Sequence, residues 1–171
     1  DELLGNPTYS RPQERVREYK KAAENVFEMT GHCVKYFVNV TSGAGEILEN
    51  VKRVEEAGAD GIMVNFAAVG YSILKLVAEN TRLPILGHAA GSGMVYEGTL
   101  NGMASPLAVG KLARLAGADI VMVNTPYGGY PLLYQKYMQT LAQLLLPYYD
   151  LKHSMPSIGG DVHPGMVEKY I

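Results

Sequence analysis

The chain has 171 residues and a mass of 18.6 kDa, and its 47% hydrophobic and 19% charged residues are typical of a globular protein with one sizeable core. A formal net charge of −2 argues against a nucleic-acid binder, because no basic stripe is present to neutralise phosphates. The longest apolar runs fall well short of the roughly 20 residues that cross a membrane. Small molecules or other protein chains are therefore the expected partners.

Helices and short apolar strands alternate along the first half of the chain. The first helix is expected to have Ser10 as its cap and Pro12 in its first turn, and to stop at Gly31. Its inner face is expected to hold Val16, Tyr19, Ala23, Val26 and Phe27. The elements expected next are a strand at 33–41, a helix at 46–56, a strand at 61–66, a helix at 71–79 and a strand at 84–88.

The single cysteine, Cys33, opens the strand expected at 33–41. A thiol in an apolar strand is expected to be buried and structural rather than nucleophilic. One cysteine forms no disulfide within its own chain, which fits a reducing cytoplasm.

A long loop at 89–105 begins the second half of the chain. It carries four glycines and exceeds the about 2 to 6 residues of ordinary βα loops, so it must do more than connect two elements. A helix at 106–115, a strand ending at Asn124, a helix at 131–146, a strand at 153–158 and the start of one more helix are expected to follow.

A nine-residue pattern occurs twice, as AGADGIMVN at 57–65 and AGADIVMVN at 116–124, with seven of nine positions identical. In both copies a helix ends on a small-Gly-small turn and leads into a buried strand. The copies lie 59 residues apart with another strand between them, so each βα unit takes about 30 residues. This favours a (β/α)8 TIM barrel over an open doubly wound sheet.

Five strands cannot close a barrel of eight, so we expect a partial barrel of about five βα units. The remaining strands are expected before Asp1 and after Ile171. The chain is therefore interpreted as an internal piece of a longer protein.

Barrel active sites lie where strands end, which selects the candidate residues. Asp1 and Glu2 are hard oxygen ligands suited to Mg²⁺, although such a pair can also be merely solvated. His88 ends a strand and could serve as acid, base or donor to a substrate oxyanion, or be a core-edge histidine. Gly159 and Gly160 could offer N–H groups to phosphate or form a simple turn.

Other strand ends carry Asn39, Asn65, Asn124 and Thr125. Asn39 and Asn65 could orient ligands or tie loops together, and the structural role is preferred. The tyrosines at 148–149 are expected to pack rather than to form a stacking platform.

Five motifs in order along the chain resemble the RuBisCO-like proteins, in particular the enolases of methionine salvage. They are the opening DELL, VNVT, ILGHAA, GKLARLAGAD and PSIGGDVHPGMV. The resemblance covers essentially the whole chain, from the end of the barrel's second strand to just past its seventh. It implies that residues 1–171 are an internal segment of the C-terminal TIM-barrel domain.

The resemblance also implies a metal site and a substrate site. The family holds Mg²⁺ with a carbamylated lysine, an aspartate and a glutamate in a Lys-x-Asp-Glu run; Asp1 and Glu2 match the last two, so the lysine would lie just upstream of Asp1. His88 matches a substrate-binding histidine. Gly159, Gly160 and Asp161 match the phosphate-binding turn, which is two residues longer here than the usual Ser-Ala-Gly-Ile-His. The phosphate-binding glycine corresponds either to Gly160 or to the position of Asp161, where a carboxylate would repel phosphate.

Three departures argue against CO₂ fixation. Carboxylating members have an arginine where this chain has Ala89, a histidine where it has Met122, and a loop lysine that is missing from 125–130. A bisphosphate would lose charge-assisted partners worth roughly 1.5 to 3 kcal/mol each.

The leading hypothesis is a Mg²⁺-dependent enolase or isomerase that forms an enediolate from a phosphorylated keto-sugar derivative, such as 2,3-diketo-5-methylthiopentyl-1-phosphate. One alternative forms the enediolate by decarboxylating a 3-oxo sugar acid. Another is a non-catalytic scaffold or assembly module. The resemblance further implies a homodimer.

Overall fold

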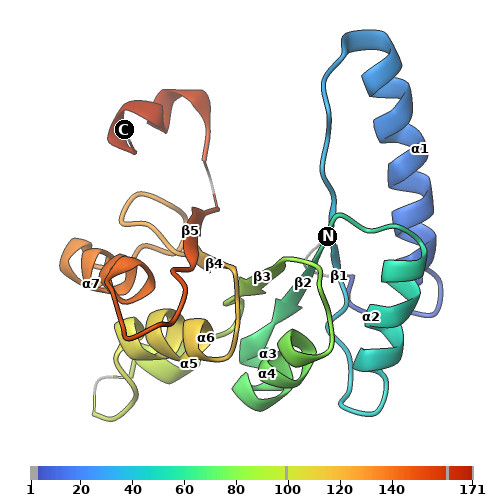
Figure 1. The fold of residues 1–171 in the computed structure, drawn as a ribbon. Helices are drawn as coiled ribbons and strands as arrows, with labels where there is room; N and C mark the ends of the chain where they lie inside the picture. The colour runs from blue at the N-terminus through green and yellow to red at the C-terminus, as the bar shows by residue number, and fades with distance from the viewer. Residues whose placement is uncertain (1–3, 99, 161, 171) are drawn as a thin grey trace.

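A computed structural model describes residues 4–98, 100–160 and 162–170. Its centre is a parallel sheet of five strands in the order β1-β2-β3-β4-β5, so each strand pairs with the one before it (Figure 1). The strands are β1 (Phe37–Asn39), β2 (Gly61–Asn65), β3 (Ile85–His88), β4 (Ile120–Val123) and β5 (Met155–Ile158). An open doubly wound sheet reverses its strand order at a switch point, whereas the described strands run in one direction, as in a barrel.

The helices that connect the strands curve around one side of the sheet, so that neighbours in sequence are neighbours in space (Figure 1). The connecting helices are α2 (Ile47–Glu56), α3 (Phe66–Val69), α4 (Tyr71–Glu79), α5 (Gly93–Tyr96), the π-helix η1 (Pro106–Lys111), α6 (Leu112–Leu115) and α7 (Tyr134–Leu145); α1 (Pro12–Thr30) precedes β1 and the 3₁₀ helix η2 (Pro164–Lys169) follows β5. Of the helices in the described ranges, not one combines the length and the apolar content needed to cross a bilayer.

The core lies between the sheet and these helices. The strands contribute fully buried β-branched side chains, and α2 and α4 contribute one apolar stripe each. These side chains include Val38, Ile62, Val64, Val121, Val123, Ile47, Val51, Val54, Leu74 and Val77. Burying each one stabilises the fold by about 1.5 to 3 kcal/mol, and this term holds the strand ends at a fixed spacing.

The repeated pattern closes two helices in the same way. Gly58 and Gly117 have φ of 83° and 95°, a left-handed conformation that a side chain would oppose. The N–H of the next residue returns to the carbonyl five residues earlier, at 3.0 Å after Gly58 and 3.1 Å after Gly117. Both turns are therefore Schellman-type caps, as the sequence predicts.

The aspartate of each repeat ties its strand to the preceding neighbour. Asp60 accepts the N–H of Tyr36 at 3.2 Å, just before β1, and Asp119 accepts the N–H of Ile85 at 2.9 Å, at the start of β3. One carboxylate thus helps to fix the register of β1 against β2, and the other helps to fix the register of β3 against β4.

Asp60 should make stability depend on acid. Burial raises the pKa of this carboxyl, but the bonds from Lys35 and the Tyr36 N–H, with the charges of Lys35 and Lys20, leave the pKa below its ordinary value. The stabilisation is therefore complete above the unfolded pKa of about 3.9 and is lost as pH falls through the lower folded pKa. Asp60→Asn should flatten this acid limb by about 1 kcal/mol or less in urea unfolding at successive pH values. Glu24→Gln on α1 should leave the limb unchanged, and an equally steep limb in Asp60→Asn would contradict the role.

The strand expected at 33–41 is shorter than predicted, because β1 begins only at Phe37. Phe37 pairs with Gly61, and β2 begins there after the AGAD turn, so residues 33–36 face no described partner strand. The prediction of a buried Cys33 is wrong for the same reason, since the thiol is exposed on this coil.

The inner face predicted for the first helix is correct only at its beginning. Val16 is buried, but Tyr19 is 52% and Phe27 56% exposed, because α1 rises beyond the rest of the described chain and its far half meets only the returning coil (Figure 1). Tyr19 stacks on Tyr36 of that coil with ring centroids 4.0 Å apart.

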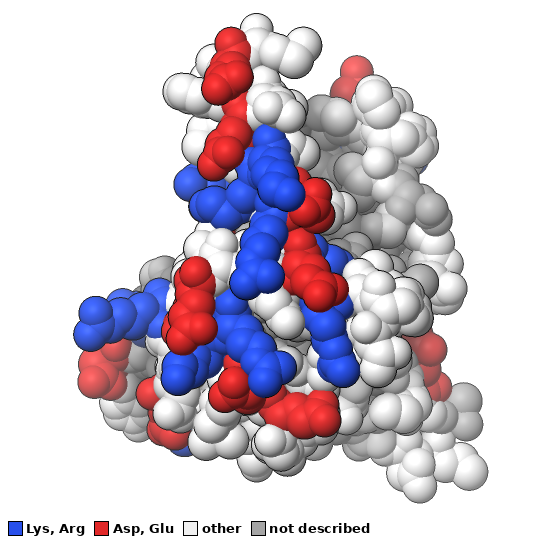
Figure 2. Space-filling view, turned by 90° about the vertical axis from the view of Figure 1, so that its right-hand side faces the viewer, with Lys and Arg blue, Asp and Glu red and all other residues white. Residues whose placement is uncertain are grey.

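Charged side chains of both signs are interspersed over α1 and α2 in the face that Figure 2 presents. Several are paired, among them Lys21 with Glu18 at 2.7 Å and Arg53 with Glu49 at 3.2 Å. This face is therefore mixed in charge rather than uniformly basic.

Candidate functional site

A cavity of about 570 Å³ lies at the carboxyl ends of three adjacent strands. Its walls come from the segments after β3, β4 and β5, which parallel pairing brings to one edge of the sheet. The lining residues are His88, Ala89, Ala90, Gly91, Gly93, Met94, Tyr96, Glu97, Met122, Asn124, Thr125, Gly128, Tyr130, Gly159 and Gly160. The predicted site residues His88, Gly159 and Gly160 therefore meet around one cavity, as expected for strand ends.

His88 is the last residue of β3 and pairs in register with Asn65 of β2. Its Nδ1 accepts the backbone N–H of Ala90 at 3.1 Å. An accepting Nδ1 carries no proton, so the neutral ring holds its proton on Nε2 and is a hydrogen-bond donor there. This tautomer suits donation to a substrate oxygen.

The long glycine-rich loop contributes α5 and, on it, Tyr96, which is 7% exposed. Burial raises the pKa of the phenol, and hydrogen bonds with Ser92 and Asn124 only partly offset that effect. Tyr96 is consequently protonated at neutral pH and links this loop to the end of β4. The Ser92 hydroxyl in turn donates to the Ala89 carbonyl at 2.6 Å.

Thr125 follows β4 and is 1% exposed. Its hydroxyl accepts the N–H of Tyr127 at 3.2 Å and lies 2.9 Å from the Tyr170 hydroxyl, which binds the end of the described chain to the loop after β4. The Lys169 ammonium stands 5.5 Å from the centre of the Tyr127 ring. Thr125 thus positions this loop.

Both glycines after β5 have structural reasons to be glycine. A Cβ at Gly159 would lie 2.7 Å from the Met122 sulfur, and Gly160 has a φ of 82°. Gly128 packs against the Gly160 carbonyl, where a Cβ would come within 2.9 Å. These contacts account for the turn, and phosphate binding by its N–H groups stays a prediction.

The two asparagines given a structural role have one. The Asn39 side chain accepts the N–H of Thr41 at 2.9 Å, and the Asn65 side chain accepts the N–H of Ala67 at 3.1 Å and caps α3. Neither lines the cavity.

Three predicted site residues, Asp1, Glu2 and Asp161, lie outside the described residues. Within 4–98, 100–160 and 162–170, no group of three or more His, Cys, Asp or Glu side chains is placed to hold a metal ion.

Sequence reasoning missed Tyr96, Glu97, Met94 and Tyr130 as cavity residues. The signal was indirect: the length of the loop at 89–105 pointed to a role, but no periodicity showed which of its side chains turn inward. Asn124 is a predicted strand end but not a predicted site residue.

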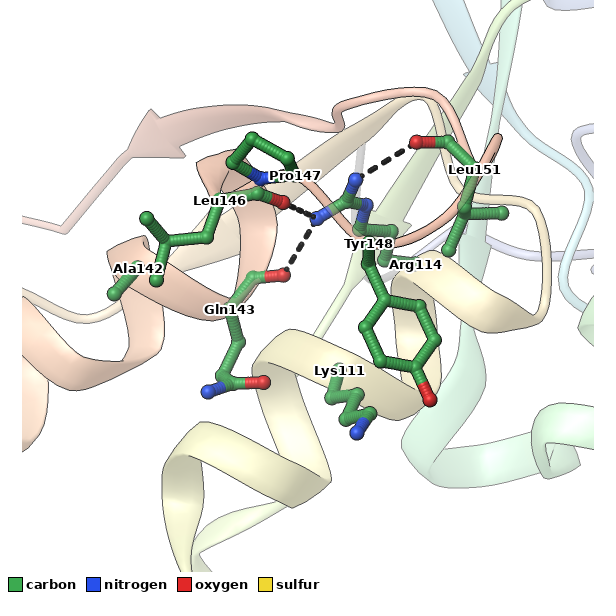
Figure 3. Close-up of a pocket in the computed structure, with 8 residues that line it drawn as sticks. All are labelled: Lys111, Arg114, Ala142, Gln143, Leu146, Pro147, Tyr148 and Leu151. Atoms are coloured by element: carbon green, nitrogen blue, oxygen red, sulfur yellow. Dashed lines mark hydrogen bonds between the residues drawn. The ribbon is translucent and has the colours of Figure 1, made fainter.

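A second cavity of about 250 Å³ lies beside α6, α7 and the segment that leads into β5. Its centre is Arg114, which is 3% exposed and donates to four backbone carbonyls: Nε to Lys152 at 2.8 Å, Nη1 to Gln143 at 3.0 Å and Leu146 at 2.7 Å, and Nη2 to Leu151 at 2.9 Å. Figure 3 shows the guanidinium bonded to the carbonyls of Gln143, Leu146 and Leu151. All its donating nitrogens are engaged at the amino end of the sheet, so this cavity is structural.

Arg114→Lys should lower the free energy of unfolding by about 2 to 3 kcal/mol, because one ammonium cannot replace a planar fork that reaches four carbonyls. Urea unfolding of the full-length protein measures this. Lys111→Arg is the matched control: its ammonium lies 4.4 Å from the Tyr148 ring centre, a contact that arginine can keep. An Arg114→Lys protein as stable as the control would refute the role.

The fold, together with the cavity at the carboxyl ends of β3, β4 and β5, defines an α/β-barrel segment with a ligand-sized cavity at its strand ends. The chain matches the family described as ribulose bisphosphate carboxylase large chain, catalytic domain, over residues 1–160. It therefore belongs to the RuBisCO large-chain family.

Individual relatives agree. A ribulose bisphosphate carboxylase-like protein of Archaeoglobus fulgidus is 39% identical over 100% of this chain and 40% of its own length. A 2,3-diketo-5-methylthiopentyl-1-phosphate enolase of Bacillus cytotoxicus is 36% identical over 98% of this chain and 41% of its own. The chain thus spans well under half of either relative.

Solved structures confirm the barrel fold. A rubisco-like protein (MtnW) from Alicyclobacillus acidocaldarius superposes with a TM-score of 0.89 at 32% identity, covering 99% of this chain and 43% of that one. A dimeric archaeal Rubisco from Hyperthermus butylicus gives 0.84 at 25% identity, covering 100% of this chain and 43% of that one.

Proposed function

We propose that the protein containing this chain is a Mg²⁺-dependent enolase or isomerase that forms an enediolate from a phosphorylated keto-sugar derivative. The observation that carries the proposal is the cavity that joins His88, Tyr96, Asn124 and the Gly159–Gly160 turn. The name of the Bacillus cytotoxicus relative supports a substrate such as 2,3-diketo-5-methylthiopentyl-1-phosphate.

The make-up of the cavity supports enolisation over carboxylation. Ala89 and Met122 line it at the positions where the resemblance puts an arginine and a histidine in carboxylating members. Tyr130 lines it from the loop that lacks the lysine. Without these cations, a bisphosphate is poorly matched to the cavity.

The chain's own residues suit binding and orientation. The Nε2–H of His88 would donate to a substrate carbonyl oxygen as negative charge develops there. The protonated Tyr96 phenol hydrogen-bonds with Asn124, and both residues line the same cavity. The N–H groups at 159–160 would bind the distal phosphate. The base that removes the proton is assigned to a lysine outside residues 1–171.

Asp1 and Glu2 are the proposed metal ligands, with a carbamylated lysine just upstream. Their carboxylate oxygens are the hard donors that Mg²⁺ prefers. The cation, when bound, supplies Lewis-acid stabilisation of negative charge on adjacent substrate oxygens.

A decarboxylase of a 3-oxo sugar acid is the second candidate. The longer phosphate-binding turn, in which Asp161 follows Gly160, favours this decarboxylase. A carboxylate at this turn would repel a phosphate, so the natural substrate would differ from that of the enolases.

Several whole-protein properties are also proposals. We infer that residues 1–171 are an internal segment of the C-terminal barrel domain, which the 40% and 41% coverage of the two relatives supports. The dimeric Rubisco from Hyperthermus butylicus supports a homodimer. A single cysteine supports a cytoplasmic location.

Hydrogen exchange tests the function directly. The full-length protein with Mg²⁺ and bicarbonate should exchange deuterium into 2,3-diketo-5-methylthiopentyl-1-phosphate at the carbon next to a carbonyl. CO₂ release from 3-oxo sugar acids without exchange would select the decarboxylase. Neither exchange nor CO₂ release across a panel of diketo phosphates and sugar acids would refute both enzymes and favour a non-catalytic scaffold.

A further inference from the structure

The charge of the cavity is uneven. Among the described residues that line it, Glu97 is the single Asp, Glu, Lys or Arg side chain. The other walls are a histidine, hydroxyl and amide groups, methionines, alanines and glycines. A carboxylate with no cationic partner in the lining repels a bound anion, so Glu97 bears on what the cavity accepts.

Local structure places this carboxylate. Glu97 follows α5, its N–H donates to the Gly93 carbonyl at 2.9 Å, and its side chain is exposed. The side chain folds back over Gly93, where a Cβ would lie 3.1 Å from Oε2. Gly93 therefore leaves the space that the carboxylate occupies at the cavity wall.

Glu97 and the Gly159–Gly160 turn line the cavity from segments that follow different strands. Glu97 lies in the segment after β3, the glycines come after β5, and β4 runs between these strands. A ligand that contacts both segments meets the N–H groups of the glycines at one place and the Glu97 carboxylate at another.

We propose that Glu97 is a specificity-determining residue that admits a ligand with one phosphate, placed at the Gly159–Gly160 turn, and disfavours a second phosphate at the other end. Its oxygens accept hydrogen bonds from the hydroxyl groups of an uncharged chain, whereas a phosphate dianion meets like charge. The inference rests on the proposed function, because that function places the phosphate at the turn.

Binding without turnover tests it. Calorimetry on the full-length protein at low ionic strength compares D-ribulose 5-phosphate with D-ribulose 1,5-bisphosphate. Glu97→Gln should raise affinity for the bisphosphate about tenfold, equivalent to 1.4 kcal/mol, and change affinity for the monophosphate by less than about twofold. Glu24→Gln, an exposed glutamate on α1, is the control and should change neither.

Two further arms separate charge from shape. Gly93→Ala should displace the carboxylate and recover part of the bisphosphate affinity. Raising the salt to 1 M, where the screening length is about 3 Å, should shrink the effect of Glu97→Gln.

Three results would overturn the proposal: an unchanged bisphosphate affinity in Glu97→Gln, an equal gain for both ligands, or no binding of either ligand. Failure of the proposed function is distinguishable, because a protein that catalyses no hydrogen exchange can still show the shift in ligand preference.

Discussion

Turnover is expected to fall by about 10²- to 10³-fold when His88 is replaced by alanine, measured as deuterium exchange by the full-length protein. The ring at the end of β3 accepts the Ala90 N–H on Nδ1, which puts the proton of the neutral ring on Nε2, and His88 lines the cavity. A donor aimed at the oxygen where charge develops contributes more to kcat than to KM, so most of the loss should be in kcat.

Imidazole supplies the internal check on this prediction. Added imidazole should restore part of the activity of His88→Ala, since the vacated space lies open to the cavity. His153→Ala is the matched control, because that exposed histidine precedes β5 at the opposite end of the sheet. Undiminished exchange in His88→Ala, with the fold intact by circular dichroism, would remove His88 from the site.

Replacing Glu2 by glutamine is expected to abolish turnover. The substitution keeps the size of the side chain and removes the charge, and a neutral amide is a much weaker ligand for Mg²⁺ than a carboxylate. The affinity of the protein for Mg²⁺, measured by calorimetry, should also fall sharply, which a purely structural defect would not produce.

Stability supplies the check on Glu2. The Tm without metal should match that of the parent protein, while the rise in Tm on adding Mg²⁺ should be lost, because a ligand stabilises only the state that binds it. Activity equal to the parent would exclude Glu2 from the metal site.

The barrel fold was predictable because its signal is local and repeated. The AGAD turn marks helix ends that need a left-handed glycine, and the spacing of its copies gives the unit length. Strand ends follow from these units, which is why His88 and the Gly159–Gly160 turn are predictable as site residues from the sequence, whereas their common cavity is a finding of the structure.

The errors arose where distant segments decide the structure. The first residue of β1 depends on where β2 begins, so the apolar residues at 33–36 resemble a strand and yet have no described partner. The apolar face of α1 likewise predicts packing, but Tyr19 and Phe27 are exposed because they extend past the described helices and strands that could bury them.

The missed cavity residues have a different cause. The loop at 89–105 has no helical or strand period, so its sequence does not tell which side chains face inward. Tyr96 is fixed by Ser92 and Asn124, the second of which comes from another strand. Such contacts become visible only when the loop and the end of β4 are seen together.

The sequential pairing of the strands bears on how the chain folds during synthesis. Paired residues of neighbouring strands lie 23 to 35 positions apart along the chain. Loop closure varies only with the logarithm of length, so the entropic costs of the four pairings differ by less than about 0.5 kcal/mol. No single pairing is therefore a bottleneck, and each unit can dock on the one before it as it leaves the ribosome. The backbone N–H groups that Asp60 and Asp119 accept then fix the register of each strand pair once the second strand has docked.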